Sequence, residues 1–251
     1  MKNDTIVDFK NIFFYYGEEP VLENISFSIK RNDFIAIMGP NGGGKTTLLK
    51  IMLGLLKPYK GTVKVFDKEP AEGRKLIGYL PQNVFFDLSF PINVFDTVIM
   101  GRYRGPVKKY SEKDKKSALD ALGTVGMLEY QKRHISMLSA GQLQRVLIAR
   151  AITREPELLL LDEPMASVDP GTQESIYELF VELNKSLAVV FVTHDIGAIS
   201  IYIDRVFCLN RKLFYHGPKE GSLGKLKEAY NCPVEILAHG IPHRVLERHK
   251  K

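Results

Sequence analysis

The chain has 251 residues, of which 45% are hydrophobic and 25% are charged. This composition is that of a globular protein with a substantial core, and it excludes the disordered and collagen-like classes. The formal charge of +6 fits an anionic partner such as phosphate, nucleic acid or a membrane surface, and it equally fits a basic surface that only aids solubility.

The N-terminal residues and the cysteines bear on where the protein works. Residues 1–10 lack the apolar core of a signal peptide, and no stretch of the chain approaches the roughly 20 apolar residues that span a bilayer. Cys208 and Cys232 lie far apart and form no CxxC motif, which favours a reducing compartment over a disulfide-bonded fold. We expect a soluble protein that reaches a membrane only through a partner.

Strands are predicted at the start of the chain. Residues 9–16 and 21–29 are short runs rich in β-branched and aromatic residues. Residues 34–38 form a continuous apolar run, which is typical of a strand buried on both faces. Similar runs recur at 158–161 and 189–192.

The third of these strands leads directly into a phosphate-binding loop. Its sequence matches the P-loop pattern GxxxxGK[ST]: Gly39, Pro40, Asn41, Gly42, Gly43, Gly44, Lys45, Thr46 and Thr47. The glycines let backbone N–H groups curl around phosphate oxygens, Lys45 supplies charge for the β- and γ-phosphates, and the Thr46 hydroxyl suits Mg²⁺. A helix beginning near Thr46, with Leu48, Leu49 and Met52 on one face, points the positive end of its dipole at the same anion. A flexible glycine-rich turn, the alternative, explains neither the buried strand before the loop nor the apolar helix face after it.

Helices are predicted in the middle of the chain. Ser111 and Asp114 have the spacing of a capping box, in which each side chain bonds the other residue's backbone N–H at a helix start. The segment that follows places Leu119, Leu122 and Val125 on one face.

A second capping box, Ser139 with Gln142, opens a helix that we expect to run to about Arg154, before Pro156. Buried strands alternating with helices predict an α/β fold with a mainly parallel sheet. The more polar and more helical residues 87–154 are interpreted as an insertion.

Acidic residues follow the apolar run at 158–161. Asp162 is in position to hold Mg²⁺ directly or through water, and Glu163 is a candidate general base for the attacking water. Adjacent carboxylates at the end of an apolar strand repel each other unless a cation or a proton lies between them. A solvated Asp-Glu-Pro turn is the alternative, and the P-loop disfavours it.

The run at 189–192 is followed by Thr193, His194 and Asp195. A lone histidine after a strand is more often structural than catalytic. Because the carboxyl ends of parallel strands share one sheet edge, we expect His194 to contact the γ-phosphate or the water beside it.

Together these residues resemble the ATP-binding subunit of an ABC transporter over nearly the whole chain. Residues 138–142 (Leu-Ser-Ala-Gly-Gln) resemble the LSGGQ signature, with Ala140 in place of its first glycine. Tyr16 resembles the aromatic A-loop residue, Gln82 the Q-loop glutamine, and residues 166–169 the D-loop. The resemblance implies a P-loop NTPase (RecA-like) core with an N-terminal antiparallel β-subdomain and an inserted helical subdomain.

The resemblance also implies roles for single residues. Tyr16 would stack on adenine, the P-loop would bind phosphates, and Gln82 and Asp162 would serve Mg²⁺ together with Thr46. Glu163 would orient or deprotonate water, and His194 would stabilise the γ-phosphate. Ser139, Gly141 and Gln142 would complete the ATP site of a second copy.

The implied cofactors are ATP and Mg²⁺, and the implied partners are several. A second copy would stack head to tail, with each signature closing over the other copy's P-loop. Integral membrane permease subunits would hold the pair at the cytoplasmic face of the cell membrane, as a peripheral subunit, and an extracytoplasmic metal-binding protein would act indirectly. Nucleic acid is not expected as a partner.

The cargo is predicted from two segments. Residues 96–103 resemble ATPases of zinc, manganese and iron(III)-chelate importers, and residues 232–243 resemble the zinc/manganese branch. His239 and His243 have the spacing of two ligands on one helix face, but Gly240 and Pro242 disfavour a helix there, so we expect solvated histidines.

The subdomains implied are a catalytic core with the β-subdomain (1–86 and 155–220), a helical subdomain (87–154) and a C-terminal tail (221–251). Three alternative functions remain: a soluble ABC ATPase of the iron–sulfur assembly type, an iron(III)-chelate importer ATPase, and a binding module with an inactive site. The intact candidate residues disfavour the last.

Overall fold

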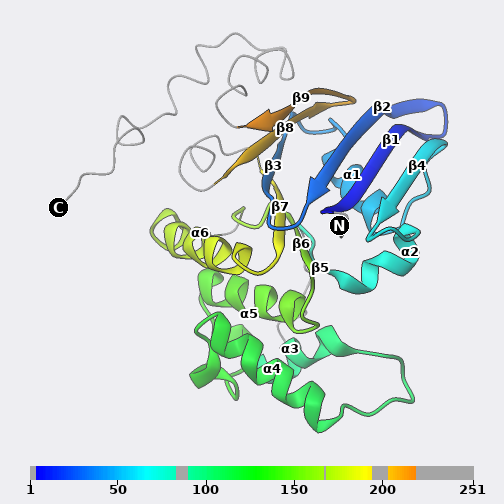
Figure 1. Ribbon diagram of the computed structural model, residues 1–251. Helices are drawn as coiled ribbons and strands as arrows, with labels where there is room; N and C mark the ends of the chain where they lie inside the picture. The colour runs from blue at the N-terminus through cyan, green and yellow to red at the C-terminus, as the bar shows by residue number, and fades with distance from the viewer. Residues whose placement is uncertain (1–3, 83–89, 167, 194–202, 219–251) are drawn as a thin grey trace. The chain divides into compact units, whose positions relative to one another are not determined.

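Figure 1 shows the computed structural model, which describes residues 4–82, 90–166, 168–193 and 203–218. The chain divides into two compact units. The first contains the residues up to 75 together with those from 188 onward, and the second contains residues 76–187. The subdomain boundaries expected from the sequence remain a prediction.

An antiparallel sheet begins the first unit. β1 (Thr5–Tyr16) lies between β2 (Glu19–Lys30) and β4 (Lys60–Val65) and pairs antiparallel with both. Phe9 and Phe27 stack with their ring centroids 4.6 Å apart, so an aromatic pair joins β1 to β2 on the buried face. The two strands predicted at 9–16 and 21–29 are confirmed, each a few residues longer than the patterns indicated.

The first unit also contains a group of mainly parallel strands. β3 (Phe34–Met38) pairs in parallel with β7 (Ala188–Val192) on one side and with β8 (Arg205–Asn210) on the other. β9 (Lys212–Pro218) then pairs antiparallel with β8. Every residue of β3 and β7 is buried, as their continuous apolar runs predicted.

Helix α1 (Lys45–Met52) follows β3 in the same unit. It begins one residue before the predicted start at Thr46, and Leu48, Leu49 and Met52 are all buried, which confirms the predicted apolar face. The short helix α2 (Pro70–Gly73) and the 3₁₀ turn η1 (Arg74–Leu76) follow β4.

The second unit combines a parallel strand pair with helices. β5 (Ile77–Leu80) pairs with β6 (Leu158–Asp162). Helices α3 (Val94–Ile99), α4 (Glu112–Thr124) and α5 (Ala140–Ile152) contact one another, and α5 also contacts β5 and α6 (Pro170–Asn184) (Figure 1). The 3₁₀ turns η2 (Met100–Arg102), η3 (Leu128–Tyr130) and η4 (Ile135–Met137) connect the helices.

Both capping boxes are present. The Ser111 hydroxyl accepts from the Asp114 N–H at 3.2 Å, while the Asp114 carboxylate accepts from the Ser111 N–H at 2.9 Å. The apolar face of α4 differs in detail from the prediction, because Leu119 is only half-buried. The buried side of α4 is formed by Asp114, Ser117, Ala118, Ala121 and Leu122.

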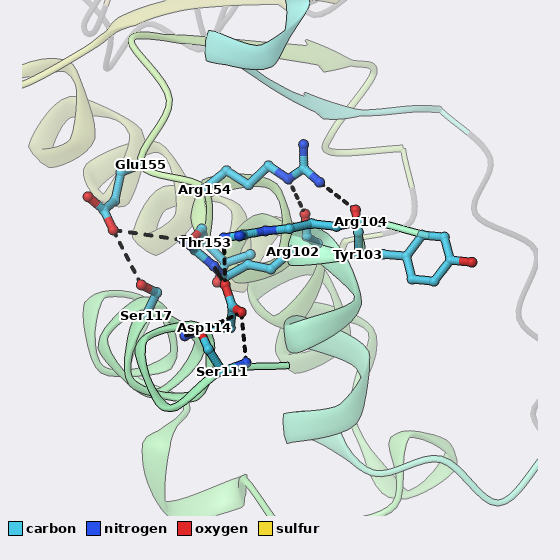
Figure 2. A network of polar contacts seen from close by, with 10 residues as sticks. Arg102, Tyr103, Arg104, Ser111, Asp114, Ser117, Thr153, Arg154 and Glu155 are labelled. Carbon is cyan, nitrogen blue, oxygen red and sulfur yellow. Dashed lines mark hydrogen bonds and ion pairs between the residues drawn. The ribbon is translucent and has the colours of Figure 1, made fainter. Parts of the chain in front are cut away.

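A buried ion pair ties the helices of the second unit together (Figure 2). Arg102, at the end of η2, is 8% exposed, and its Nε donates to Asp114 Oδ1 at 2.5 Å. Its Nη1 donates to the carbonyl of Thr153, directly after α5, at 2.7 Å. Arg104 adds a second donor to Asp114 at 3.0 Å. The guanidinium of Arg102 therefore joins three segments that are distant in sequence.

The same contacts hold Asp114 in its charged form. Hydrogen bonds from the backbone and hydroxyl of Ser111, then the bond from Arg102, lower the pKa of the Asp114 carboxyl well below that of an ordinary aspartate. Since the folded-state pKa is depressed, this carboxylate stabilises the fold above the unfolded-state pKa, and that stabilisation is lost as the pH falls below it.

We therefore expect Asp114→Asn to lower the melting temperature at pH 7 by about 5–15 °C, because it removes the nearer of the two carboxylates that pair with the buried Arg102 and leaves only the exposed Glu155 at 3.9 Å. The difference from the unmodified protein should shrink as the pH falls below about 4, where the unfolded carboxyl is protonated. Thermal denaturation across pH measures this. Asp120→Asn, an exposed position on the same helix, is the matched control. Equal losses in both variants, or a difference that does not change with pH, would contradict the assignment.

Candidate active site

The P-loop turns sharply between β3 and α1. Gly42 and Gly44 have φ angles of 76° and 94°, in the left-handed region that glycine adopts without strain. The N–H of Gly43 donates to the carbonyl of Pro40 at 3.0 Å, which closes the turn. A Cβ on Gly44 would lie 2.7 Å from Leu22 Cδ2, so this glycine is also required by the packing of β2 behind it.

Part of the P-loop's support comes from the end of β8, which the sequence did not indicate. A Cβ on Gly39 would lie 1.7 Å from the carbonyl oxygen of Leu209, so only glycine fits beside this strand. Arg211, whose φ is 57°, donates its N–H to the carbonyl of Gly43 at 3.0 Å and accepts from the N–H of Glu23 at 2.8 Å. The turn between β8 and β9 thus links the P-loop to β2.

Lys45 lies inside the loop with 6% of its surface exposed. Its ammonium donates to the carbonyl of Gly39 at 2.8 Å and to that of Pro40 at 3.0 Å. Thr46 is half-buried and Thr47 is buried, while Asn41 and Gly42 are exposed. The first turn of α1 has no acidic residue, so backbone N–H groups and one ammonium make the loop positive.

Tyr16 ends β1 in the same unit as the P-loop. Its side chain is 51% exposed, and its ring meets Phe14 edge to face at 5.0 Å between centroids. The edge contact with Phe14 orients the ring, and the exposed surface leaves area on which a flat base can stack.

A second group of candidate residues lies in the second unit, at the carboxyl ends of β5 and β6. These strands are parallel neighbours, with Leu80 opposite Leu161, so the residues that follow them emerge side by side. Gln82 Nε2 donates to Glu163 Oε2 at 3.0 Å. The structure therefore brings together the Q-loop glutamine and the candidate base, which lie far apart in the sequence.

Asp162, the last residue of β6, is 2% exposed. Burial, and then the negative charge of Asp162, raise the pKa of Tyr79 to about 12, so the Tyr79 hydroxyl stays protonated. Glu163 adopts a φ of 48°, a conformation unusual for a residue with a side chain. The backbone thus turns sharply between the buried Asp162 and the half-buried Glu163.

The signature segment, residues 138–142, surrounds the start of α5. Ser139 is the N-cap: its hydroxyl accepts from the Gln142 N–H at 3.2 Å, and Gln142 Oε1 accepts from the Ser139 N–H at 3.1 Å. The second predicted capping box is confirmed, although α5 ends at Ile152, before the expected Arg154. Ser139 and Ala140 are exposed, whereas Gly141 is buried.

Several predicted residues lie outside the described part of the chain. These are His194, Ser167, and the tail residues Cys232, His239, His243 and His249. Among residues 4–82, 90–166, 168–193 and 203–218, no cluster of three His, Cys, Asp or Glu side chains could hold a metal ion. Within those ranges no helix is both long and apolar enough to cross a membrane.

Residues 22–166 match the family model described as "ABC transporter", a span that covers the P-loop, the signature segment and the residues after β6. The chain belongs to the ABC transporter family. Because the ATP-binding subunits of this family are ATPases, the protein binds and hydrolyses ATP.

Named relatives support this ABC ATPase assignment. The manganese transport system ATP-binding protein MntB of Listeria monocytogenes is 41% identical over 229 residues, which cover 89% of this chain and 95% of the relative. The zinc uptake system ATP-binding protein ZurA of the same organism is 38% identical and covers 84% of this chain and 85% of its own.

A solved structure agrees with the fold of this ABC ATPase. A dimeric bacterial ABC transporter cassette is 32% identical, with a TM-score of 0.67, and covers 86% of this chain and 99% of its own. The predicted α/β class, with mostly parallel strands and an antiparallel N-terminal sheet, is confirmed.

Two P-loop glycines allow a paired test of loop geometry. Gly42→Ala carries only the strain of a left-handed φ, because nothing lies within 4 Å of its Cβ position. Gly44→Ala carries the same kind of strain and also a steric clash with Leu22. In the nucleotide-free protein we expect melting temperatures lowered by roughly 2–5 °C and 5–15 °C, respectively. Differential scanning calorimetry measures both. Equal shifts would contradict the close packing of Gly44 on β2.

Proposed function

We propose that this ABC ATPase powers uptake of a divalent transition metal ion, zinc or manganese ahead of iron, through separate membrane subunits. The observation that carries the cargo is the likeness, over more than four-fifths of the chain, to subunits named for manganese transport and zinc uptake. The same relatives give no support to a soluble iron–sulfur assembly ATPase.

The nucleotide roles proposed for the first unit follow from its geometry. Tyr16 stacks on the base, since it is half exposed and oriented by Phe14. The P-loop, Gly39 to Thr47, cradles the phosphates, since two of its glycines have left-handed φ angles and Lys45 lies inside it. The hydroxyl of Thr46 lies at the start of α1, beside the phosphate position.

Mg²⁺ fits the donor set. It prefers oxygen ligands, and Thr46, Gln82 and Asp162 offer a hydroxyl, an amide carbonyl and a carboxylate. Gln82 donates its amide nitrogen to Glu163, which leaves the amide oxygen as its ligand atom. When bound, the ion would supply positive charge to the β- and γ-phosphate oxygens.

Glu163 acts as the base for the attacking water. Gln82 holds one carboxylate oxygen at 3.0 Å, which orients the side chain, and the other oxygen accepts the water proton. His194 is proposed to contact the γ-phosphate, on the grounds of its position in the sequence after β7.

We propose that two copies enclose ATP head to tail, with Ser139, Gly141 and Gln142 of one copy facing the P-loop of the other. The N-terminus of α5 suits an anion because backbone N–H groups point outward from it and Ser139 is exposed. The dimeric state of the related cassette supports this arrangement.

The proposed partners are permease subunits in the membrane, which hold the ATPase at the cytoplasmic face, and an extracytoplasmic protein that binds the metal. Cargo recognition would lie in those proteins, while this chain supplies the power stroke. Nucleic acid is not proposed as a partner.

The ATPase roles of Lys45 and Glu163 can be separated. Lys45→Ala should lower ATP affinity by about 100-fold or more, because it removes the ammonium from the phosphate cradle. Glu163→Gln should bind ATP with affinity near that of the unmodified protein, yet hydrolyse it at least roughly 100-fold more slowly. Nucleotide titration and phosphate release measure the two effects, with Glu157→Gln as a control carboxylate. Unmodified turnover in Glu163→Gln would refute the assignment of the base.

The cargo can be tested in vesicles that contain the ATPase with its permease subunits. ATPase activity should rise when a zinc- or manganese-loaded binding protein is present, because the loaded protein would favour the closed ATP dimer over the open one. An effector shifts such an equilibrium only through its differential affinity for the two states. The metal-free binding protein is the control. Stimulation by a sugar- or amino-acid-binding protein, without any by a metal-loaded one, would exclude the cargo proposal and leave the ATPase assignment intact.

A further inference from the structure

We propose that Thr172, on α6, is a positioning residue for the signature segment of its own subunit. Residue 141 is glycine because the methyl group of Thr172 occupies the space that a side chain would need. This inference rests on the proposed function, in which the signature segment serves the ATP of the other copy. It goes beyond the role that the family resemblance implies for Gly141, which is to help complete the ATP site of a second copy.

The backbone conformation does not require glycine at position 141. Gly141 lies in the first turn of α5 and is not among the described glycines with a positive φ. In an ordinary helical conformation glycine is less favourable than alanine, because it loses more conformational freedom on folding. A spatial contact must therefore account for it.

That contact is with Thr172. A Cβ on Gly141 would lie 2.4 Å from Thr172 Cγ2 and 3.3 Å from Thr172 Cβ. Non-bonded carbon atoms are attracted at about 3.5–4.0 Å and repel strongly at closer approach. Alanine at 141 therefore requires α5 and α6 to move apart at the signature segment.

Thr172 is poorly able to yield. Its N–H donates to the side chain and to the carbonyl of Asp169, both at 3.0 Å, because Asp169 is the N-cap of α6. The pKa of the Asp169 carboxyl is lowered mainly by a hydrogen bond from the Thr172 side chain, and less by the one from its backbone N–H, so the Thr172 side chain is also tied to the N-cap. Its carbonyl accepts from the Ser175 hydroxyl at 2.7 Å, and its β-branched side chain has few rotamers in a helix.

Arg145 holds the two helices together one turn further along α5. Residues 141 and 145 are four apart and share a helix face. Arg145 Nη1 donates to the carbonyl of Val125, after α4, at 2.9 Å, and Nη2 donates to the carbonyl of Ser175 on α6 at 3.2 Å. Since α5 is tied to α4 and α6 on this face, it cannot easily shift to accommodate a methyl group.

Two local hydrogen bonds lie along the segment that runs from Glu163 to the first turn of α6. The Ala166 N–H donates to the carbonyl of Glu163 at 3.3 Å, and the Gln173 side chain donates to the carbonyl of Val168 at 3.0 Å. Thr172 is thus carried by the segment that begins at the candidate base. It sets the position of the signature segment relative to the end of β6 in the same subunit.

The test starts from the Glu163→Gln protein, whose ATP-bound dimer should persist, and adds Gly141→Ala. Light scattering should show ATP-dependent dimerisation weakened by about tenfold or more, because the signature segment is displaced. ATP affinity of the monomer should change less than about twofold, since the P-loop is untouched. In the protein that keeps Glu163 and carries only Gly141→Ala, turnover at saturating ATP should fall by a similar factor of about ten.

Rescue distinguishes the contact from the alternatives. Thr172→Ser removes Cγ2 and should restore dimerisation and turnover of Gly141→Ala to within about threefold of the parent, whereas Thr172→Val, which keeps both branches, should not. Thr172→Ser alone should lose less than about threefold. Gly123→Ala on α4 is the matched control, because it is also a helical glycine and nothing lies within 4 Å of its Cβ position.

The outcomes separate cleanly. If Gly141→Ala is impaired and Thr172→Ser does not rescue it, the glycine serves the partner's phosphate and the inference is wrong. Full activity of Gly141→Ala would also overturn the inference. Calorimetry identifies a Gly141→Ala protein that fails to fold; in that case, restored folding and dimerisation on adding Thr172→Ser would still support the contact, and no restoration would contradict it. Failure of the parent protein to dimerise or hydrolyse ATP would count instead against the proposed function.

Discussion

The parallel pairing of β3 with β7 and β8 is the constraint on which the nucleotide-binding unit depends. The ladder places Met38 opposite Cys208, so the chain leaves β3 directly beside Leu209. No side chain fits between Gly39 and the Leu209 carbonyl, and the P-loop must begin its turn there. The burial of β3 at every residue makes this register costly to change, because a shift would expose apolar surface and break the ladder.

In the second unit, polar side chains act together with apolar packing to define how the helices meet. Arg102 reaches from η2 to Asp114 and to the Thr153 carbonyl, and Arg145 reaches from α5 to α4 and α6. Such groups are directional, so they help to specify one relative position of the helices. The signature segment, which we propose presents a helix N-terminus to the phosphate of another subunit, needs a fixed position of this kind. Figure 2 shows the bonds of Arg102 to Asp114 and to the Thr153 carbonyl.

Charged residues in both units are oriented by contacts within the protein itself. Lys45 is bonded to carbonyls of its own loop, and Glu163 is bonded to Gln82. Groups that are already oriented lose little freedom when a substrate arrives, which is the physical basis of electrostatic preorganisation. The contacts of both residues also explain why these buried or half-buried charges are tolerated inside the fold.

Local physics determined much of this protein from sequence alone. The apolar runs that became β3, β6 and β7, the P-loop, and the two capping boxes each depend on residues within a few positions of one another, so their patterns could be interpreted directly. Other elements were not expected, among them β8, β9 and α6, although Asp169 and Pro170 are a local signal for the start of α6. The Leu209 carbonyl against Gly39, the Gln82–Glu163 bond, the Arg102–Asp114 pair and the Thr172 methyl against Gly141 join residues that are distant in the chain. Only the tertiary structure decided them, because such contacts follow from how strands and helices pack and not from the spacing of residues along the sequence.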